Sequence, residues 1–182
     1  DEDEDTDDIT AYVDSAKKNK KKHHDVTVFQ PNTITFWREF RNGRLLDGPG
    51  LSIWDGNVYE GDFVGFERSG TGRMSRTTGE TYYGQWKHDR EWGIGEIRTR
   101  AQDTYVGHWY NGFRNGTGYQ SYEEGGTFYG KWMNDRRHGI GLFHWPDKTY
   151  TTREYYKGEL VAKRPQQDAG WTQKQLATWG VN

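Results

Sequence analysis

The chain has 182 residues, of which 31% are hydrophobic, 16% are aromatic and 24 are glycine, and its formal net charge is −2. This length accommodates one domain with tails, and so small an aliphatic content excludes a thick aliphatic core. The absence of cysteine excludes a disulfide framework and a thiol-ligated metal site. No apolar run approaches the roughly 18 residues of a membrane-spanning helix.

Two charged blocks open the chain. Residues 1–8 are acidic except for Thr6, and residues 17–24 are basic or histidine except for Asn19. Blocks of like charge are typical of solvated tails, so residues 1–25 are predicted to form a charged, poorly ordered tail. The alternative is that one block docks on a partner of opposite charge.

Residues 26–160 are predicted to form a repeat array. An aromatic-x-Gly-x-aromatic pattern starts at residues 59, 82, 105 and 128, always 23 residues apart, and a Gly-x-Gly follows each copy. A fixed period of roughly 20 to 50 residues marks a repeat array. Alternate side chains of a strand share a face, so the two rings and the glycine of each copy point to one side. The residues predicted on this aromatic face are Tyr59, Phe63, Tyr82, Trp86, Tyr105, Trp109, Phe128 and Trp132.

Each period is predicted to be one β-hairpin. Turn-forming residues such as 111–115 follow the rings, and a short second strand such as 119–122 is expected after each Gly-x-Gly. The glycine between the rings leaves a gap into which a ring of the neighbouring strand fits. Successive hairpins are expected to pair edge to edge. The predicted fold class is therefore all-β, a single-layer elongated antiparallel sheet.

These copies resemble the membrane occupation and recognition nexus (MORN) repeat, whose pattern is close to Tyr-x-Gly-x-Trp followed by Gly and then Gly-x-Gly. The resemblance covers residues 59–145 and, more weakly, residues 36–58. Residues 36–40 carry Arg38 where the glycine belongs, and residues 150–154 keep only a leading aromatic, Tyr150. Both are predicted to be degenerate terminal repeats that cap the array.

Residues 161–182 are predicted to be a C-terminal extension with a short helix. The helix is expected between Asp168 and Trp179, and Gly180 is expected to stop it. Trp171, Leu176 and Trp179 lie near one stripe of that helix. Because so short a helix is marginal alone, the stripe is expected either to fold back on the sheet or to bind a partner.

No pattern predicts catalysis, a cofactor or a metal site. The glycines match no phosphate-binding loop, no serine has the setting of a nucleophile, and the six histidines lack the spacing of zinc sites. His108 lies between Gly107 and Trp109, so it is expected on the solvated face opposite the rings. The chain is therefore predicted not to be an enzyme and to need no cofactor.

Arginines recur at the predicted hairpin tips. Since each hairpin adds two strands, they are expected to line one edge of the sheet about 10 Å apart. A row of guanidinium groups suits anionic lipid head groups or an acidic protein segment. Arginine is also an ordinary loop residue, and acids nearby such as Asp89 and Glu91 offset the charge. The arginines predicted for this basic edge are Arg68, Arg90, Arg114, Arg136 and Arg137.

The favoured function is a non-enzymatic structural scaffold or adaptor subunit of a multiprotein complex, which binds partners through the aromatic face and the sheet edges. The resemblance implies the same, because MORN proteins occur in ciliary radial spokes, parasite cytoskeletons, membrane-contact junctophilins and organelle assemblies. One alternative is a peripheral membrane module that binds acidic phospholipids, against which the net charge of −2 argues. Another is the regulatory repeat segment of a larger enzyme, since plant lipid kinases and a lysine methyltransferase carry such repeats.

The expected location is intracellular, at the cytoskeleton or cilium or at the periphery of a membrane complex. A location in an organelle is expected if the chain, which starts at Asp1, is a processed mature form. No nucleic-acid partner is expected.

Overall fold

The computed structural model describes residues 26–29, 34–38, 40–41 and 44–165. The expected charged tail, residues 1–25, and the expected C-terminal helix, residues 168–179, lie outside this part of the chain. The strands are β1 (Val26–Phe29), β2 (Ile34–Trp37), β3 (Phe40–Arg41), β4 (Arg44–Leu45), β5 (Gly48–Trp54), β6 (Asn57–Val64), β7 (Glu67–Ser75), β8 (Thr81–Lys87), β9 (Arg90–Arg98), β10 (Thr104–Tyr110), β11 (Phe113–Ser121), β12 (Thr127–Met133), β13 (Arg136–His144), β14 (Tyr150–Tyr156) and β15 (Glu159–Pro165).

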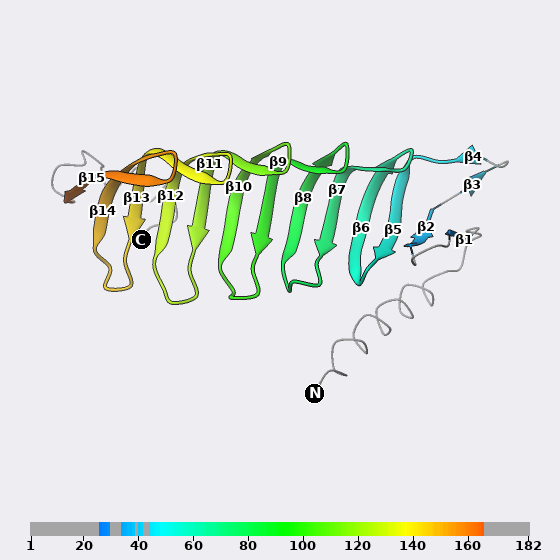
Figure 1. The fold of residues 1–182 in the computed structure, drawn as a ribbon, viewed down its shortest axis with the longest axis horizontal. Helices are drawn as coiled ribbons and strands as arrows, with labels where there is room; N and C mark the ends of the chain where they lie inside the picture. Colours follow the sequence, from blue (N-terminus) through cyan, green and yellow to red (C-terminus); the bar gives the residue numbers. More distant parts are fainter. Residues whose placement is uncertain (1–25, 30–33, 39, 42–43, 166–182) are drawn as a thin grey trace, which may run out of the picture.

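These strands build one long open sheet. Thirteen of them are hydrogen-bonded in the order β1-β2-β5-β6-β7-β8-β9-β10-β11-β12-β13-β14-β15, and β3 and β4 pair separately. Neighbours in the sheet are antiparallel, and Figure 1 shows β5 to β14 side by side along the long axis. The predicted all-β antiparallel sheet of consecutive hairpins is confirmed for the described residues, which contain no helix.

The turns between the paired strands are shorter than the sequence pattern predicts. In the β10–β11 hairpin, Tyr110 pairs with Phe113, so the turn holds only Asn111 and Gly112. Both residues have positive φ, 55° and 85°, which is the conformation that a two-residue hairpin turn requires. As a result β11 begins at Phe113, directly after the turn, and the expected short strand at residues 119–122 is only its distal end.

Each strand that carries the aromatic pattern bends at its glycine. In β10 the pairing with β11 shifts between Gly107 and Trp109, and Gly116 of β11 has a φ of 108°. A bulge of this kind bends a strand, and the positive φ favours glycine because it has no Cβ. The same shift occurs in β6, β8 and β12. The strands therefore turn over near their tips, as the upper part of Figure 1 shows, and the sheet folds along its length around the rings.

The rings on the inner side of this fold interlock into one ladder. Tyr82 meets Trp86 of its own strand and Trp109 of the next repeat edge to face, each with 5.1 Å between ring centroids. Such pairs are worth about 0.5 to 1.5 kcal/mol each beyond the area they bury. The eight rings predicted to share one face all belong to this core, which confirms the predicted side for each of them.

Glycine makes room for the ladder, but the ring over the glycine of the aromatic pattern belongs to its own strand and not, as predicted, to the neighbouring one: a Cβ added to Gly107 would lie 2.5 Å from the Tyr105 hydroxyl oxygen. A Cβ added to Gly118 of β11 would lie 2.3 Å from Cε2 of Tyr105 on the neighbouring strand β10. Gly118 pairs directly with Gly107, so both positions beneath the ring lack a side chain. The tyrosine ring therefore lies directly on backbone, which no other residue at position 118 allows without displacing the ring.

The two ends of the array differ from the interior in the same way. Gly139 pairs with Tyr155 just as Gly116 pairs with Trp132, so Tyr155 is the in-phase aromatic of the last repeat. The prediction that this repeat keeps only Tyr150 is therefore wrong. Its glycine position holds Arg153, as that of the first repeat holds Arg38.

These arginines and the last strand close the core. The guanidinium of Arg38 lies 4.7 Å from the Phe63 ring centroid, and that of Arg153 lies 4.7 Å from that of Phe143. Tyr155 ends the ladder against Phe128, at 5.7 Å. Strand β15 continues to Pro165, beyond the expected end of the array at residue 160.

Candidate interaction surfaces

The predicted aromatic face is the interior of the protein. Its eight rings are between 0% and 7% exposed, and their polar atoms bind mainly backbone: the hydroxyl of Tyr105 donates to the carbonyl of His108 at 3.0 Å, and Nε1 of Trp109 donates to that of Gly95 at 3.1 Å. Burial raises the pKa of the Tyr59, Tyr82 and Tyr105 hydroxyls above the ordinary value. Direct contact between these rings and a partner stays an untested prediction, and the exposed surface lies elsewhere.

The predicted basic edge is only partly formed. Arg114 turns inward, with its guanidinium 4.4 Å from the Trp132 ring centroid and 5.5 Å from that of Tyr105. Arg68 and Arg137 likewise cover rings of the ladder, and only Arg90 and Arg136 of the five are exposed. The reason is strand alternation: Arg114 pairs with Trp109, so both point to the inner side. The attraction between a cation and a π face holds the side chain there.

The inward arginines also join consecutive repeats. The backbone N–H and Nε of Arg114 donate to Oδ1 of Asp135 at 2.9 and 3.1 Å, and its Nη2 donates to the Asp135 carbonyl at 3.1 Å. Arg68 binds Asp89 with the same three contacts. Sequence reasoning missed this pairing, although the constant distance of 21 residues between partners was a readable signal.

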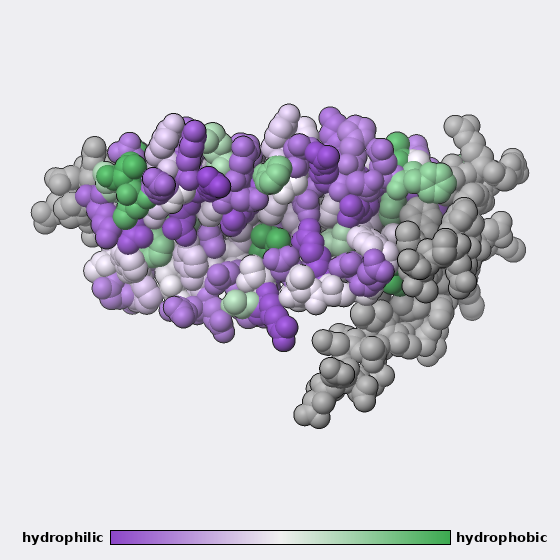
Figure 2. Space-filling view, viewed as in Figure 1, coloured by the Kyte–Doolittle hydropathy of each residue, from purple (hydrophilic) through white to green (hydrophobic). Residues whose placement is uncertain are grey.

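Large apolar side chains are exposed where the two-residue turns lie, and we call this surface the hairpin-tip rim. Its members lie in or beside three alternate turns, at residues 65–66, 111–112 and 157–158. They are Val64 (57% exposed), Phe66 (68%), Tyr110 (55%), Phe113 (45%) and Tyr156 (56%). In Figure 2 most of the visible face is hydrophilic, with a hydrophobic patch over the β15 end, where Leu160 and Val161 are exposed.

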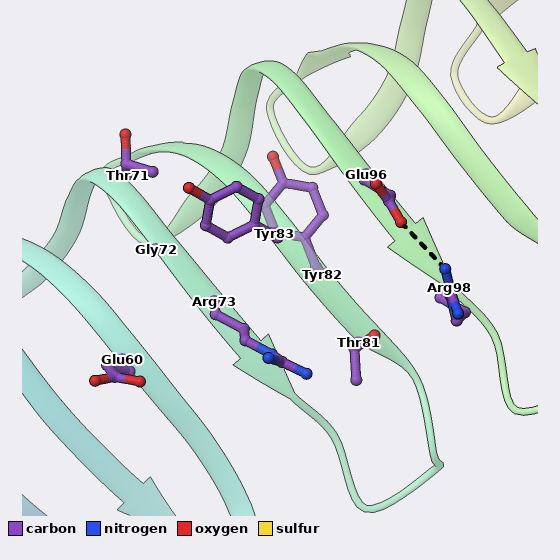
Figure 3. Close-up of a pocket in the computed structure, with 9 residues that line it drawn as sticks. All are labelled: Glu60, Thr71, Gly72, Arg73, Thr81, Tyr82, Tyr83, Glu96 and Arg98. Atoms are coloured by element: carbon purple, nitrogen blue, oxygen red, sulfur yellow. Dashed lines mark ion pairs between the residues drawn. The ribbon is translucent and has the colours of Figure 1, made fainter. Parts of the chain in front are cut away.

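A shallow depression lies on the outer side of the sheet, opposite the ring ladder (Figure 3). Its volume is about 550 Å³. Register places Glu60 of β6, Arg73 of β7, Tyr83 of β8 and Glu96 of β9 in one row across it. Arg98 pairs with Glu96 at 3.7 Å, so two cations balance two carboxylates. No cluster of metal-ligating side chains occurs in the described part of the chain.

The geometry defines a class of protein, a β-hairpin repeat array with a closed aromatic core and a long exposed rim. The sequence model of the MORN repeat matches residues 82–99, 105–127 and 128–150, which are consecutive hairpins of this array. The chain therefore carries consecutive MORN repeats within residues 82–150. MORN repeats mediate interactions with proteins or membranes. No curated protein matches the sequence.

Proposed function

We propose that this protein is a non-enzymatic scaffold or adaptor subunit of a larger protein assembly, and that it binds a protein partner through the hairpin-tip rim. The observation that carries the proposal is the contrast between a closed core and an exposed apolar edge. The eight predicted rings of the ladder are at most 7% exposed, whereas Tyr110 and Phe113 of the rim are 55% and 45% exposed. Tyr110 and Phe113 are paired across one turn, and adjoining exposed apolar side chains often mark an interaction site.

The Tyr110 ring of the rim is held in place in the free protein. The Tyr110 ring of β10 packs on Trp92 of the neighbouring strand β9, with 4.6 Å between ring centroids. Lys87 lies on β8, the other neighbour of β9, and its ammonium is 4.8 Å from the Trp92 ring centroid. Side chains fixed on paired strands lose little conformational freedom on binding, which favours affinity. Tyrosine and tryptophan are also the residues that most often dominate interface energies.

The test replaces the rim without disturbing the core. The double variant Tyr110→Ser with Phe113→Ser is compared with Ile94→Ser with Ile140→Ser, which removes two exposed aliphatic side chains that lie away from the tips. Each tagged variant is returned to the native source, and its incorporation into the assembly is measured by quantitative co-purification. Incorporation of the rim variant is expected to fall roughly tenfold or more, since truncating a hot-spot ring costs about 2 kcal/mol of binding free energy. Equal incorporation of the two double variants contradicts the proposal.

A peripheral membrane module is the second candidate, because basic residues are exposed beside the aromatic tips. Arg90 and Arg136 flank the turns next to the rim, and Phe66 is 68% exposed. Rings with neighbouring cations suit a bilayer interface with anionic lipids. The net charge of −2 opposes such binding. No helix in the described ranges is long and apolar enough to cross a bilayer.

Vesicle sedimentation separates the two candidates. Vesicles with acidic phosphoinositides are expected to retain little of the chain at 0.15 M salt, where electrostatic attraction is screened within about 8 Å. The membrane function is favoured instead if acidic vesicles retain the chain tightly, neutral vesicles do not, and the double variant Arg90→Glu with Arg136→Glu abolishes the retention.

For the scaffold role, the proposed location is a cytoskeletal or ciliary assembly or the periphery of a membrane complex.

A further inference from the structure

The second residue of each of the strands β7, β9, β11 and β13 points inward and contacts the turn of the next repeat, 21 residues later. The backbone contact is the same in four repeats: the N–H of Asp89, Gly112, Asp135 and Gly158 donates to the carbonyl of Arg68, Glu91, Arg114 and Arg137 at 3.1, 3.0, 3.1 and 2.9 Å. In the first three repeats, the turn residue matches the charge of the inward side chain that it contacts. Each arginine meets an aspartate, and Glu91, already an anion, meets a glycine and binds Arg76 instead.

Arg137 breaks this rule. It is a cation, but the turn residue it meets is Gly158, which supplies no carboxylate. Its guanidinium donates instead to the hydroxyls of Tyr122 and Tyr155. No carboxylate oxygen of the described residues lies within 4 Å of it, whereas Asp135 lies at 3.1 Å from Arg114. The last complete repeat therefore lacks the acceptor that the chain itself gives to the corresponding arginines.

A second cation adjoins the first. Arg153, which stands at a glycine position of the pattern, donates to the same hydroxyl of Tyr155 at 3.4 Å, and Arg137 does so at 3.3 Å. The Nε of Arg153 is buried and has no hydrogen-bond partner among the described residues. Because the two phenol oxygens accept from arginine, their own protons remain available for a further acceptor. Two cations and two hydroxyls thus converge, and the described residues place no anion beside them.

The place of the absent acceptor is open. Gly158 is exposed, and the nearest atoms to a Cβ built on it belong to Arg136, at 3.5 to 3.6 Å. Its φ of 95° lies in the same region as the 62° and 63° of Asp89 and Asp135 at the equivalent turn positions. Asp89 and Asp135 reach their arginines from equivalent turns while 47% and 42% exposed, so a carboxylate beside Gly158 has the same exposed approach to Arg137.

We propose that Arg137 and Arg153, with the hydroxyls of Tyr122 and Tyr155, form a binding site for a carboxylate of an acidic peptide segment of a partner protein. The site favours carboxylate because this chain already satisfies the equivalent arginines with aspartate, and guanidinium groups bind carboxylates with two parallel hydrogen bonds. The proposal deepens the scaffold function but uses residues other than the rim. A negative result for the Arg137 site therefore does not bear on the rim, and a negative result for the rim does not bear on the Arg137 site.

The probe is a fluorescent peptide with the sequence of residues 1–8, in which every residue except Thr6 is acidic. In the full chain used for the assay, the acids of residues 1–8 are changed to their amides, so that its own acidic block does not compete. Fluorescence anisotropy measures binding at low and at 0.15 M salt. We expect binding that weakens with salt and falls at least tenfold in Arg137→Gln and in Gly158→Asp, which supplies the missing acceptor internally.

Gly112→Asp is the matched control. It adds the same charge to the equivalent turn beside Glu91, so it is expected to leave peptide affinity within about twofold of the parent chain. Gly158→Asp is also expected to have a higher urea midpoint of unfolding than Gly112→Asp, because both substitutions place a side chain at positive φ and only the first brings a carboxylate to Arg137.

Three results overturn the proposal. They are equal affinity of Gly158→Asp and Gly112→Asp, equal binding of the all-amide peptide, and no peptide binding at all. Binding of inorganic phosphate or phosphoinositide vesicles that depends on Arg137, in the absence of peptide binding, identifies the site as a phosphate site and likewise rejects an acidic peptide partner.

Discussion

Asp135 ties one repeat to the previous one through Arg114, because its Oδ1 accepts both the backbone N–H and Nε of that residue, at 2.9 and 3.1 Å. The same arginine lies 4.4 Å from the Trp132 ring centroid. One side chain thus serves as a hydrogen-bond donor to the turn and as a cover for the ring ladder. The junction between repeats therefore depends on polar contacts as well as on ring packing.

Asp135→Ala is expected to destabilise the protein by about 1 to 2 kcal/mol, since it removes an ionised acceptor from two donors that remain half-buried. Urea unfolding measures the loss, which should shrink at high salt. Glu124→Ala, an exposed loop acid, is the control and should change stability by less than about 0.5 kcal/mol. Equal effects of the two substitutions would show that the pair is only a surface contact.

Gly118→Ala is expected to cost at least about 2 kcal/mol, because its Cβ would lie 2.3 Å from the Tyr105 ring, which is held by its neighbours. Gly112→Ala is the comparison. That glycine has positive φ but its nearest contact is 3.6 Å away, so only the backbone cost of about 1 kcal/mol applies. Thermal and urea unfolding report both. A smaller effect at position 118 than at 112 contradicts the close packing of ring on backbone.

Two tryptophans of the ladder are expected to respond differently to phenylalanine. Nε1 of Trp86 donates to the Gly72 carbonyl at 3.1 Å, whereas the buried Nε1 of Trp132 has no acceptor among the described residues. Trp86→Phe should therefore destabilise the protein by about 1 kcal/mol more than Trp132→Phe, although both remove the same ring area. Equilibrium unfolding of the two variants decides this, and the reverse order would disprove the assigned hydrogen bonds.

Alkaline pH is expected to unfold the protein cooperatively. Burial raises the pKa of Tyr59, Tyr82 and Tyr105, so their neutral form stabilises the fold below the unfolded pKa of about 10, and that stability is lost as pH rises above it. Each tyrosine contributes a slope of up to about 1.4 kcal/mol per pH unit. Urea unfolding between pH 9 and 11 measures the sum.

Tyr82→Phe should remove about a third of that slope, since Phe128 occupies the same position of its own repeat and shows that the ring alone fits. The variant also loses the bond from the Tyr82 hydroxyl to the Gln85 carbonyl, which lowers stability equally at all pH values below 10. An unchanged slope in this variant would mean that the interior tyrosines do not control alkaline unfolding.

Much of the fold was predictable because the information is local and repeated. The 23-residue period predicts hairpins, and the alternation of Tyr105, Gly107 and Trp109 predicts a common side for the two rings. Even the clearance at Gly118 follows from the size of a ring above a paired backbone. These features depend only on neighbours in the sequence or on an adjacent strand, so four copies of one pattern determine them.

The tertiary structure decided which surfaces face solvent. Alternation assigns a side to each ring, but the bulge at Gly107 folds the sheet over that side, and this curvature converts an expected binding face into a core. The inward turn of Arg114 and the role of Tyr155 depend on which residues pair across strands, a register that pairing of whole strands sets. The sequence by itself therefore determined the repeat and its ring side, and only the folded sheet determined what remains exposed to a partner.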